Sequence, residues 1–216
     1  MDDDLTVRLV PQIPETGRED AARLFWQAFQ GKLGKVMGPD AKAIAFLTRV
    51  LNPSFGIAAL DVEGRVIGIA GFKTADGALV GGEMRDLFAV YGVFGGLWRG
   101  VTLSVLERET APGTLLMDGI FVESRARGLG VGTQLLHAIK ARAAELGLDH
   151  VRLDVIDSNP KARALYERQG FQAEGQSHLG PLSWIFGFKS ATAMRVRVNG
   201  PKAQHSLPNP PGRSPA

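Results

Sequence analysis

Cysteine is absent from the 216 residues, which excludes disulfides, thiolate metal ligands and covalent intermediates on a cysteine. This absence is compatible with a reducing cytoplasm, and we expect a cytoplasmic protein. The four histidines are scattered without the spacing of a metal-binding motif, so no metal site is predicted. The first ten residues, MDDDLTVRLV, are acidic and lack the apolar stretch of a secretory signal.

A concentrated charge of one sign is also missing. The net charge is +3, and Lys202 and Arg213 near the end of the chain supply two of these charges. The remainder forms no basic stripe, so a nucleic-acid partner is not expected. Residues 199–216 are rich in proline and polar residues, which predicts a disordered tail after a single domain over residues 1–198.

Apolar residues recur at two different periods along the chain, which indicates a mixed α/β (α+β) protein. An early pair of apolar runs around DVEGR predicts a hairpin, with Gly64 available for positive φ. A strand–helix–strand–helix unit follows in the middle of the chain. Helices are expected over 18–29, 38–53, 130–147 and 159–170, and strands over 5–10, 55–72 (the hairpin), 114–122, 150–156, 171–175 and 190–198.

A long helical region over 83–109 falls inside an insertion at about 74–112. Its stretch 87–106 is almost entirely apolar, but Arg99 sits well inside it, and a charge at a bilayer centre costs about 2.5–3.5 kcal/mol. We therefore favour a buried or surface-lying helix over a membrane span. The region could cover the sheet, form a pocket wall, pack against a second subunit or anchor the protein on a membrane surface.

Glycines 128, 130 and 132 stand where the strand over 114–122 leads into the next helix. The first turn of a helix has free backbone N–H groups, and glycine lets an oxyanion approach them. Arg125 and Arg127 add positive charge, so the loop suits a phosphate or pyrophosphate. The alternative is a plain glycine-rich turn. The stretch matches neither a P-loop nor a Rossmann fingerprint.

The segment IFVESRARGLGVGTQLL resembles the acetyl-CoA loop of the GCN5-related N-acetyltransferase (GNAT) superfamily, whose pattern is Gln/Arg-x-x-Gly-x-Gly/Ala after an apolar strand. A second segment at the right distance, DVIDSNPKARALYERQGF, resembles the family's N-x-x-A-x-x-L-Y-x-x-x-G-F motif. The resemblance covers roughly residues 5–198 and is tight over 114–172. The matching positions of the second motif are Asn159, Ala162, Leu165, Tyr166, Gly170 and Phe171.

The resemblance implies the GNAT fold: a mixed, mostly antiparallel central sheet with helices on both faces. It also implies an N-acetyltransferase that moves an acetyl group from acetyl-CoA to a primary amine by direct attack in a ternary complex. The acceptor would be a small-molecule amine or a protein N-terminus, and a homodimer is possible. A non-catalytic acyl-CoA-binding or sensing module on the same fold is the alternative. The chain departs from the family by its long helical insertion between the third and fourth strands.

By the same resemblance, the strand before the loop would bind the pantetheine arm through its backbone, and the loop would bind the pyrophosphate through its N–H groups. Asn159 would cap the next helix and contact the cofactor. Tyr166 would protonate the departing thiolate, unless it only packs in the core. The backbone positions implied are Ile120, Phe121 and Val122 for the arm, and Arg127, Gly128, Leu129, Gly130, Val131, Gly132 and Thr133 for the pyrophosphate.

The general base is left open by the sequence. Asp118 is the first candidate because it lies on the cofactor strand, and Asp118-Gly119 would form a bulge there or, alternatively, a hairpin turn. Glu83, Glu107 and His178 are weaker candidates, and each could be an ordinary solvated charge. The aromatic residues of the insertion would favour an acceptor of apolar character; they are Phe88, Tyr91, Phe94 and Trp98.

Overall fold

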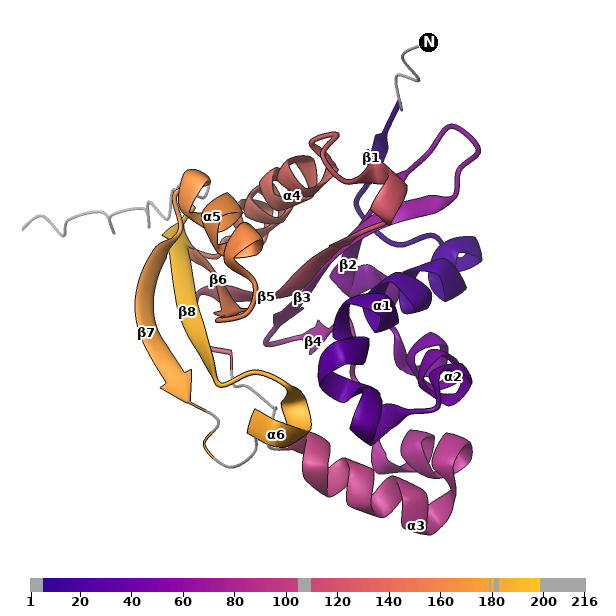
Figure 1. Ribbon diagram of the computed structural model, residues 1–216. Helices are drawn as coiled ribbons and strands as arrows, with labels where there is room; N and C mark the ends of the chain where they lie inside the picture. Colours follow the sequence, from indigo (N-terminus) through magenta and orange to yellow (C-terminus); the bar gives the residue numbers. More distant parts are fainter. Residues whose placement is uncertain (1–5, 105–109, 179, 181–182, 199–216) are drawn as a thin grey trace, which may run out of the picture.

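The computed structural model of the protein describes residues 6–104, 110–178, 180 and 183–198 (Figure 1). Its centre is one twisted sheet in the order β1-β2-β3-β5-β6-β8-β7, with the short β4 paired to β3. Only β5 and β6 pair in parallel; the other pairs are antiparallel. The strands are β1 (Arg8–Val10), β2 (Gly56–Leu60), β3 (Val66–Thr74), β4 (Gly77–Ala78), β5 (Thr114–Val122), β6 (His150–Ile156), β7 (Gln172–His178) and β8 (Ser190–Arg197).

Helices cover both faces of this sheet, as the resemblance to the GNAT fold implies (Figure 1). One face carries α1 (Arg18–Met37), α2 (Asp40–Val50) and α3 (Met84–Ser104), and the other carries α4 (Val131–Glu145) and α5 (Pro160–Arg168). A short α6 (Ser183–Phe186) lies beside α1. Each face has its own cluster of buried apolar side chains, so the sheet separates two cores.

Local patterns in the sequence explain most of these elements. Strands β5 and β6 have the predicted bounds, and Gly64 turns the β2–β3 hairpin with a φ of 80°. Helix α1 is longer than expected, since it continues from residue 29 to Met37. Glycines 31 and 34 weaken the helical signal there, but Val36 and Met37 extend the buried stripe of the helix.

A bulge interrupts β5 at the place the sequence suggested. Opposite β3, Gly71 pairs with Gly119 and Phe72 pairs with Met117, so Asp118 is the extra residue. The strand continues through this point, which excludes the alternative of a hairpin turn at Asp118-Gly119. On its other edge, β5 pairs with β6 only from Thr114 to Met117. Beyond the bulge the two parallel strands separate.

Helix α3 is a hairpin of two antiparallel legs rather than one continuous helix through the long helical region expected over 83–109. Gly92 adopts φ 75° and ψ 171°, which reverses the chain direction. A Cβ at Gly96 would lie 3.0 Å from the backbone nitrogen of Phe88, and one at Gly100 would overlap the sulfur of Met84. These glycines therefore allow the legs to pack closely. Residues 105–109, the end of the expected helical region, lie outside the described residues.

The α3 segment is the one helix in the described ranges that is long and apolar enough to cross a membrane by length and composition. A span of the hydrocarbon core, about 30 Å thick, needs about 20 consecutive helical residues. The reversal at Gly92 leaves two legs that are each much shorter than this. The folded arrangement therefore argues against a membrane span, in line with the expectation from Arg99.

Polar contacts fix the α3 hairpin to the junction of α1 and α2. The Tyr91 hydroxyl donates to the carbonyl of Met37 (2.5 Å), and the Arg99 guanidinium donates to the carbonyl of Gly38 (3.3 Å). The same guanidinium lies 4.1 Å from the centre of the Tyr91 ring. At the start of α3, Asp86 pairs with Arg49 of α2. The insertion is thus part of the core on this face of the sheet.

Candidate functional site

The glycine loop places the beginning of α4 beside the second half of β5. Gly128 and Gly130 have φ values of 82° and 77°, and a Cβ at either position would meet nothing within 4 Å. A Cβ at Gly132 would touch Ile120 of β5 and Leu165 of α5, each at 3.9 Å. The three elements therefore meet at Gly132, and the open side of the loop leaves room for a ligand.

Free amide groups are concentrated at this end of α4. The helix ladder begins with the N–H of Gln134, which donates to the carbonyl of Gly130 (3.0 Å). The N–H groups of residues 131–133 precede this first bond, so they point out of the helix end together with the positive end of its dipole. This arrangement can bind an oxyanion without any cationic side chain.

The two arginines of the loop have structural partners. Arg127 donates through Nε to the carbonyl of Val122 (3.0 Å) and so ties the loop to the end of β5. Arg125 donates to Glu123 (2.8 Å) and to Asp61 (3.0 Å), which lies in the β2–β3 turn. The expectation that both arginines supply charge to a phosphate is therefore weakened for Arg125, because its guanidinium holds the loop against the hairpin.

Asp61 is a buried carboxylate whose side chain is only 2% exposed. Burial alone would raise the pKa of Asp61. The N–H of Arg65 and the guanidinium groups of Arg65 and Arg125 outweigh burial and hold this pKa below its ordinary value. The carboxylate therefore joins the hairpin turn to the glycine loop in its charged form.

Asp61→Asn should lower the free energy of unfolding at pH 7 by about 1.5–3 kcal/mol, the usual contribution of hydrogen bonds to charged groups. The amide oxygen can still accept the N–H groups of Glu63 and Arg65, so the variant removes mainly the contacts to the guanidinium groups. The lowered pKa means that this stabilisation is present above the unfolded pKa and lost as the pH falls through the folded pKa. Urea denaturation at pH 7 and at acidic pH would test both points; a constant difference between wild type and variant would contradict the assignment.

The separation of β5 from β6 brings two aspartates together. The last parallel pair is Met117 with Leu153, and the next residue on each strand is an aspartate, Asp118 on β5 and Asp154 on β6. Both line one cavity of about 510 Å³ on the α1–α3 face of the sheet, as does Lys73 of β3. The rest of its wall is mainly apolar and includes Phe25, Phe29, Leu33, Phe46, Leu47, Met84, Leu87 and Leu103.

The sequence did not single out Asp154. The alternation in HVRLDVI could have located it, because Val151, Leu153 and Val155 face the α4–α5 core and Asp154 must face the other side. Its approach to Asp118 then follows from the parallel pairing of the two strands, which the strand–helix–strand pattern predicts. Lys73 could not be identified as a site residue from the sequence, because it does not belong to any recognised motif.

The other proposed bases do not line this cavity among the residues that the structure describes. Glu83 is exposed and pairs with Arg85, and His178 lies at the exposed end of β7. Glu107 lies outside the described residues. Asp118 is thus the predicted base that reaches the cavity.

The aromatic residues of α3 do not form the cavity wall, which was one of the roles that the sequence left open for this region. Phe94 and Trp98 are 89% and 45% exposed, Phe88 packs between the two legs against Gly96, and Tyr91 is buried at the α1–α2 junction. The chain reverses at Gly92, between these aromatic residues. Their spacing in the sequence therefore does not place them on one face of a helix. The α3 residues that do reach the cavity are Met84, Leu87, Gly100, Leu103 and Ser104.

Tyr166 of α5 is buried in the core on the opposite face, with 8% of its surface exposed. Its ring lies 5.8 Å from that of Phe171, and burial raises the pKa of its hydroxyl to about 12. Within the described ranges the hydroxyl makes no hydrogen bond, which leaves it available to a ligand. Asn159 caps α5 by accepting the N–H of Ala162 (3.2 Å), as its place before Pro160 predicts.

The backbone of Ile120, Phe121 and Val122 pairs with β3 on one edge. On the other edge, where β6 has diverged, these residues have no strand partner in the described part of the chain. An extended ligand could hydrogen-bond to this edge as an added strand would.

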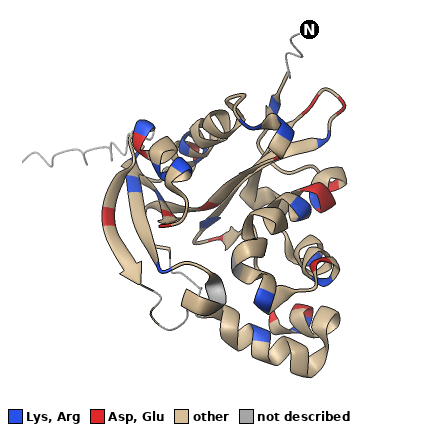
Figure 2. Ribbon diagram, viewed as in Figure 1, with Lys and Arg blue, Asp and Glu red and all other residues tan. Residues whose placement is uncertain are grey.

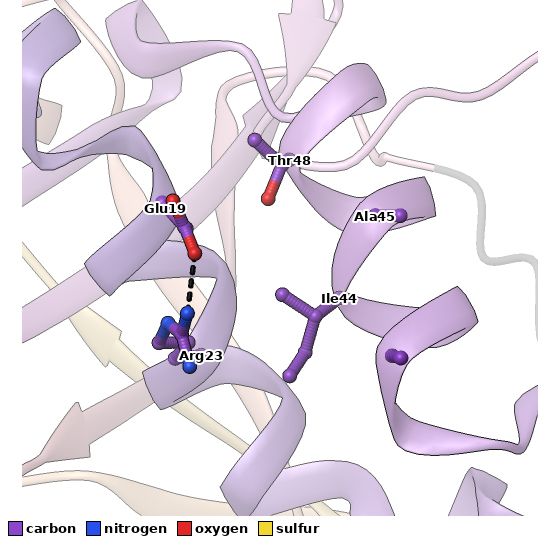
Figure 3. A pocket seen from close by; sticks show the side chains of 6 residues that line it. Glu19, Arg23, Ile44, Ala45 and Thr48 are labelled. Carbon is purple, nitrogen blue, oxygen red and sulfur yellow. Dashed lines mark hydrogen bonds and ion pairs between the residues drawn. The ribbon is translucent and has the colours of Figure 1, made fainter.

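A second concavity, of about 550 Å³, lies between α1 and α2 (Figure 3). Its two charged side chains, Glu19 and Arg23, pair with each other, and the remaining lining residues are Ala41, Ile44, Ala45 and Thr48. Although this hollow is slightly larger, it contains none of the groups described above. We therefore place the functional site at the β5–β6 separation.

Comparison with known proteins identifies the family of the chain. The family model described as the acetyltransferase (GNAT) family matches residues 18–171. Among curated proteins, the chain is 30% identical over 102 residues to a spermine/spermidine N(1)-acetyltransferase of Bacillus subtilis, a match that covers 47% of this chain and 57% of the relative. It is 26% identical over 167 residues to the D-amino-acid N-acetyltransferase HPA3 of Saccharomyces cerevisiae, covering 77% of this chain and 87% of the relative. The chain thus spans little more than half of the Bacillus relative.

Solved structures show the same fold. An N-acetyltransferase from Staphylococcus aureus Mu50 superposes with a TM-score of 0.61 at 16% identity, covering 88% of this chain and all of that one, 100%. A phosphinothricin acetyltransferase from Sinorhizobium meliloti, solved in complex with AcCoA, gives a TM-score of 0.53 at 16% identity over 90% of this chain and 89% of that one. With the family model matching most of the sequence, the chain belongs to the GNAT family of acetyltransferases.

Proposed function

We propose that the protein transfers the acetyl group of acetyl-CoA to a primary amine by direct attack in a ternary complex. Enzymes of the GNAT family use acetyl-CoA. The observation that carries the proposal is the open edge of β5, which has free amide groups of α4 at one end and two aspartates at the other. A thioester and an amine bound along this edge would meet where β5 and β6 separate.

The residues around the β5–β6 separation fit the individual parts of acetyl-CoA. The N–H groups of residues 131–133 and the open loop at Gly128 and Gly130 suit the pyrophosphate. The unpaired edge of β5 from Ile120 to Val122 suits the amide groups of the pantetheine arm. When bound, the cofactor supplies an activated acetyl group as a thioester.

Two side chains have the properties that acyl transfer to an amine requires. The carboxylate of Asp118 takes a proton from the acceptor ammonium, which frees the nitrogen to attack the acetyl carbon. The hydroxyl of Tyr166 gives its proton to the sulfur as the carbon–sulfur bond breaks. The second proton that the nitrogen loses returns through solvent to the Tyr166 oxygen, so one proton is released overall. With a pKa raised to about 12, the Tyr166 hydroxyl carries its proton at neutral pH.

Release of free CoA thiol from acetyl-CoA, measured with a panel of primary amines, would test the proposal. We expect amine-dependent release well above the rate of hydrolysis without amine, and mass spectrometry should find the N-acetylated amine. Calorimetric binding of acetyl-CoA without release for any amine would instead support the alternative, a non-catalytic acyl-CoA-binding module. The absence of acetyl-CoA binding would contradict both.

A further inference from the structure

We infer that the acceptor is an amine with a single positive charge and a bulky apolar body, and that Asp154 together with Asp118 receives its ammonium group. This inference rests on the proposed function, since it names the acceptor that the same site would take. The juxtaposition of two carboxylates at the strand separation with an apolar cavity behind them carries it.

Aromatic side chains of α1 form one wall of the cavity beside β5. The ring of Phe25 lies 4.5 Å from that of Phe29, and both contact Phe121 of β5, with ring centres 5.1 and 5.5 Å apart. Helix α2 adds Phe46 and Leu47 to the cavity, and the first leg of α3 adds Leu87. A volume of about 510 Å³ is within the usual range for small-molecule sites. Such a wall stabilises an aromatic or aliphatic body by removing it from water.

The charged side chains of the cavity lining restrict the polar head group that the acceptor can carry. Within the described part of the chain, the cavity lining carries two carboxylates, Asp118 and Asp154, and one ammonium, Lys73. Arg152 pairs with Asp154 at 3.5 Å from outside the lining, so the charges of these four side chains balance. The two carboxylates of the lining lie at the strand separation, so a single ammonium group can meet them there, whereas a further positive charge on the acceptor would face the apolar wall.

Other amine classes fit this cavity less well. A polyamine would place its further ammonium groups against aromatic and aliphatic side chains, where a charge without a partner is costly. An amino acid would bring a third carboxylate into the lining, with Lys73 as its nearest cation. A short alkylamine would leave the apolar wall uncovered. The similarity to a polyamine acetyltransferase and to an amino-acid acetyltransferase makes these the relevant competitors.

Four amines separate these classes: 2-phenylethylamine, ethylamine, phenylalanine and spermidine. We expect kcat/KM for 2-phenylethylamine to exceed that for ethylamine by about 10–100-fold, the effect of burying an aromatic side chain. It should also exceed the values for phenylalanine and spermidine. Preference for ethylamine, phenylalanine or spermidine would overturn the inference and leave the proposed function intact.

Asp154→Asn should raise KM for 2-phenylethylamine about tenfold or more and leave KM for acetyl-CoA nearly unchanged, because a charge-assisted contact to the ammonium is lost. Glu145→Gln removes the same charge from the exposed end of α4 and serves as the control. An unchanged KM in Asp154→Asn would overturn the role of this residue.

Two further measurements test the inference without relying on turnover or on the correct folding of Asp154→Asn. Calorimetry measures the affinity of 2-phenylethylamine for protein saturated with CoA, and it does so even if no amine is acetylated. Binding of 2-phenylethylamine without acetylation of any amine would contradict only the proposed function. Gly81→Leu adds a side chain to the cavity lining at a position with open space. It should weaken binding of 2-phenylethylamine and spare ethylamine; equal effects on both would argue against an apolar body in this cavity.

Discussion

Tyr166→Phe should lower kcat by about 10²–10⁴, the usual contribution of a general acid. The ring stays in its place against Phe171, so only the hydroxyl and its proton are lost. Because burial raises the pKa of Tyr166 to about 12, the wild-type enzyme should show no loss of activity from this residue through the neutral and mildly alkaline range. Steady-state and single-turnover kinetics, with affinity for acetyl-CoA measured separately, would check the expectation.

Tyr91→Phe is a matched control for this prediction. Tyr91 is also buried, its pKa is likewise raised to about 12 by burial, and its hydroxyl donates to the Met37 carbonyl at the junction of α1 and α2. Its loss should reduce stability by about 1 kcal/mol and leave kcat within a few-fold of wild type. Similar kcat values for Tyr166→Phe and the wild type, with chemistry shown to limit the rate, would remove Tyr166 from the mechanism.

Gly130→Val should reduce affinity for CoA by on the order of 100-fold. The side chain would occupy the open space at the start of α4 and keep the pyrophosphate from the amide groups, where one or two charge-assisted hydrogen bonds of about 1.5–3 kcal/mol each are at stake. Isothermal calorimetry with CoA measures this directly and needs no acceptor.

The substitution also introduces backbone strain, since Gly130 has a φ of 77°. Gly147→Val is the appropriate control. Gly147 ends the same helix with a φ of 69°, and a Cβ there also meets nothing within 4 Å. The two variants should therefore lose similar stability, but only Gly130→Val should lose affinity for CoA. Equal affinities in both variants would place the pyrophosphate elsewhere.

The sequence predicted the part of the site that depends on backbone geometry. A glycine loop at a helix start and an asparagine before a proline each have a dominant local conformation, and the positions of Gly130 and Asn159 follow from it. For Asp118-Gly119 the sequence allows a bulge or a hairpin turn, and the pairing of β5 with β3 decides for the bulge. The parallel pairing of β5 and β6 follows from the strand–helix–strand pattern.

The side of the site formed by α1–α3 depends on tertiary contacts, and the sequence predicts it poorly. The reversal at Gly92 rests on one residue among several glycines, and sequence periodicity cannot show which of them breaks the helix. The close contact of Gly96 with Phe88 could be recognised only after the reversal was known. For this reason the sequence spacing offers Phe94 and Trp98 for a pocket wall, whereas other α3 residues line the cavity.

The short pairing of β5 with β6 has a mechanical consequence. Among the residues that the structure describes, four residue pairs, from Thr114–His150 to Met117–Leu153, connect the strands of the leaf β1-β2-β3-β5 with those of the leaf β6-β8-β7. A ligand bound beyond these four pairs would act as a clamp between the two leaves, because it would add hydrogen bonds to β5 and contacts to α5, which follows β6 in the chain. By linkage, a clamp present at 100 times its Kd stabilises the folded chain by about 2.7 kcal/mol. The donor of the acyl group would thus also hold together the cavity in which its recipient binds.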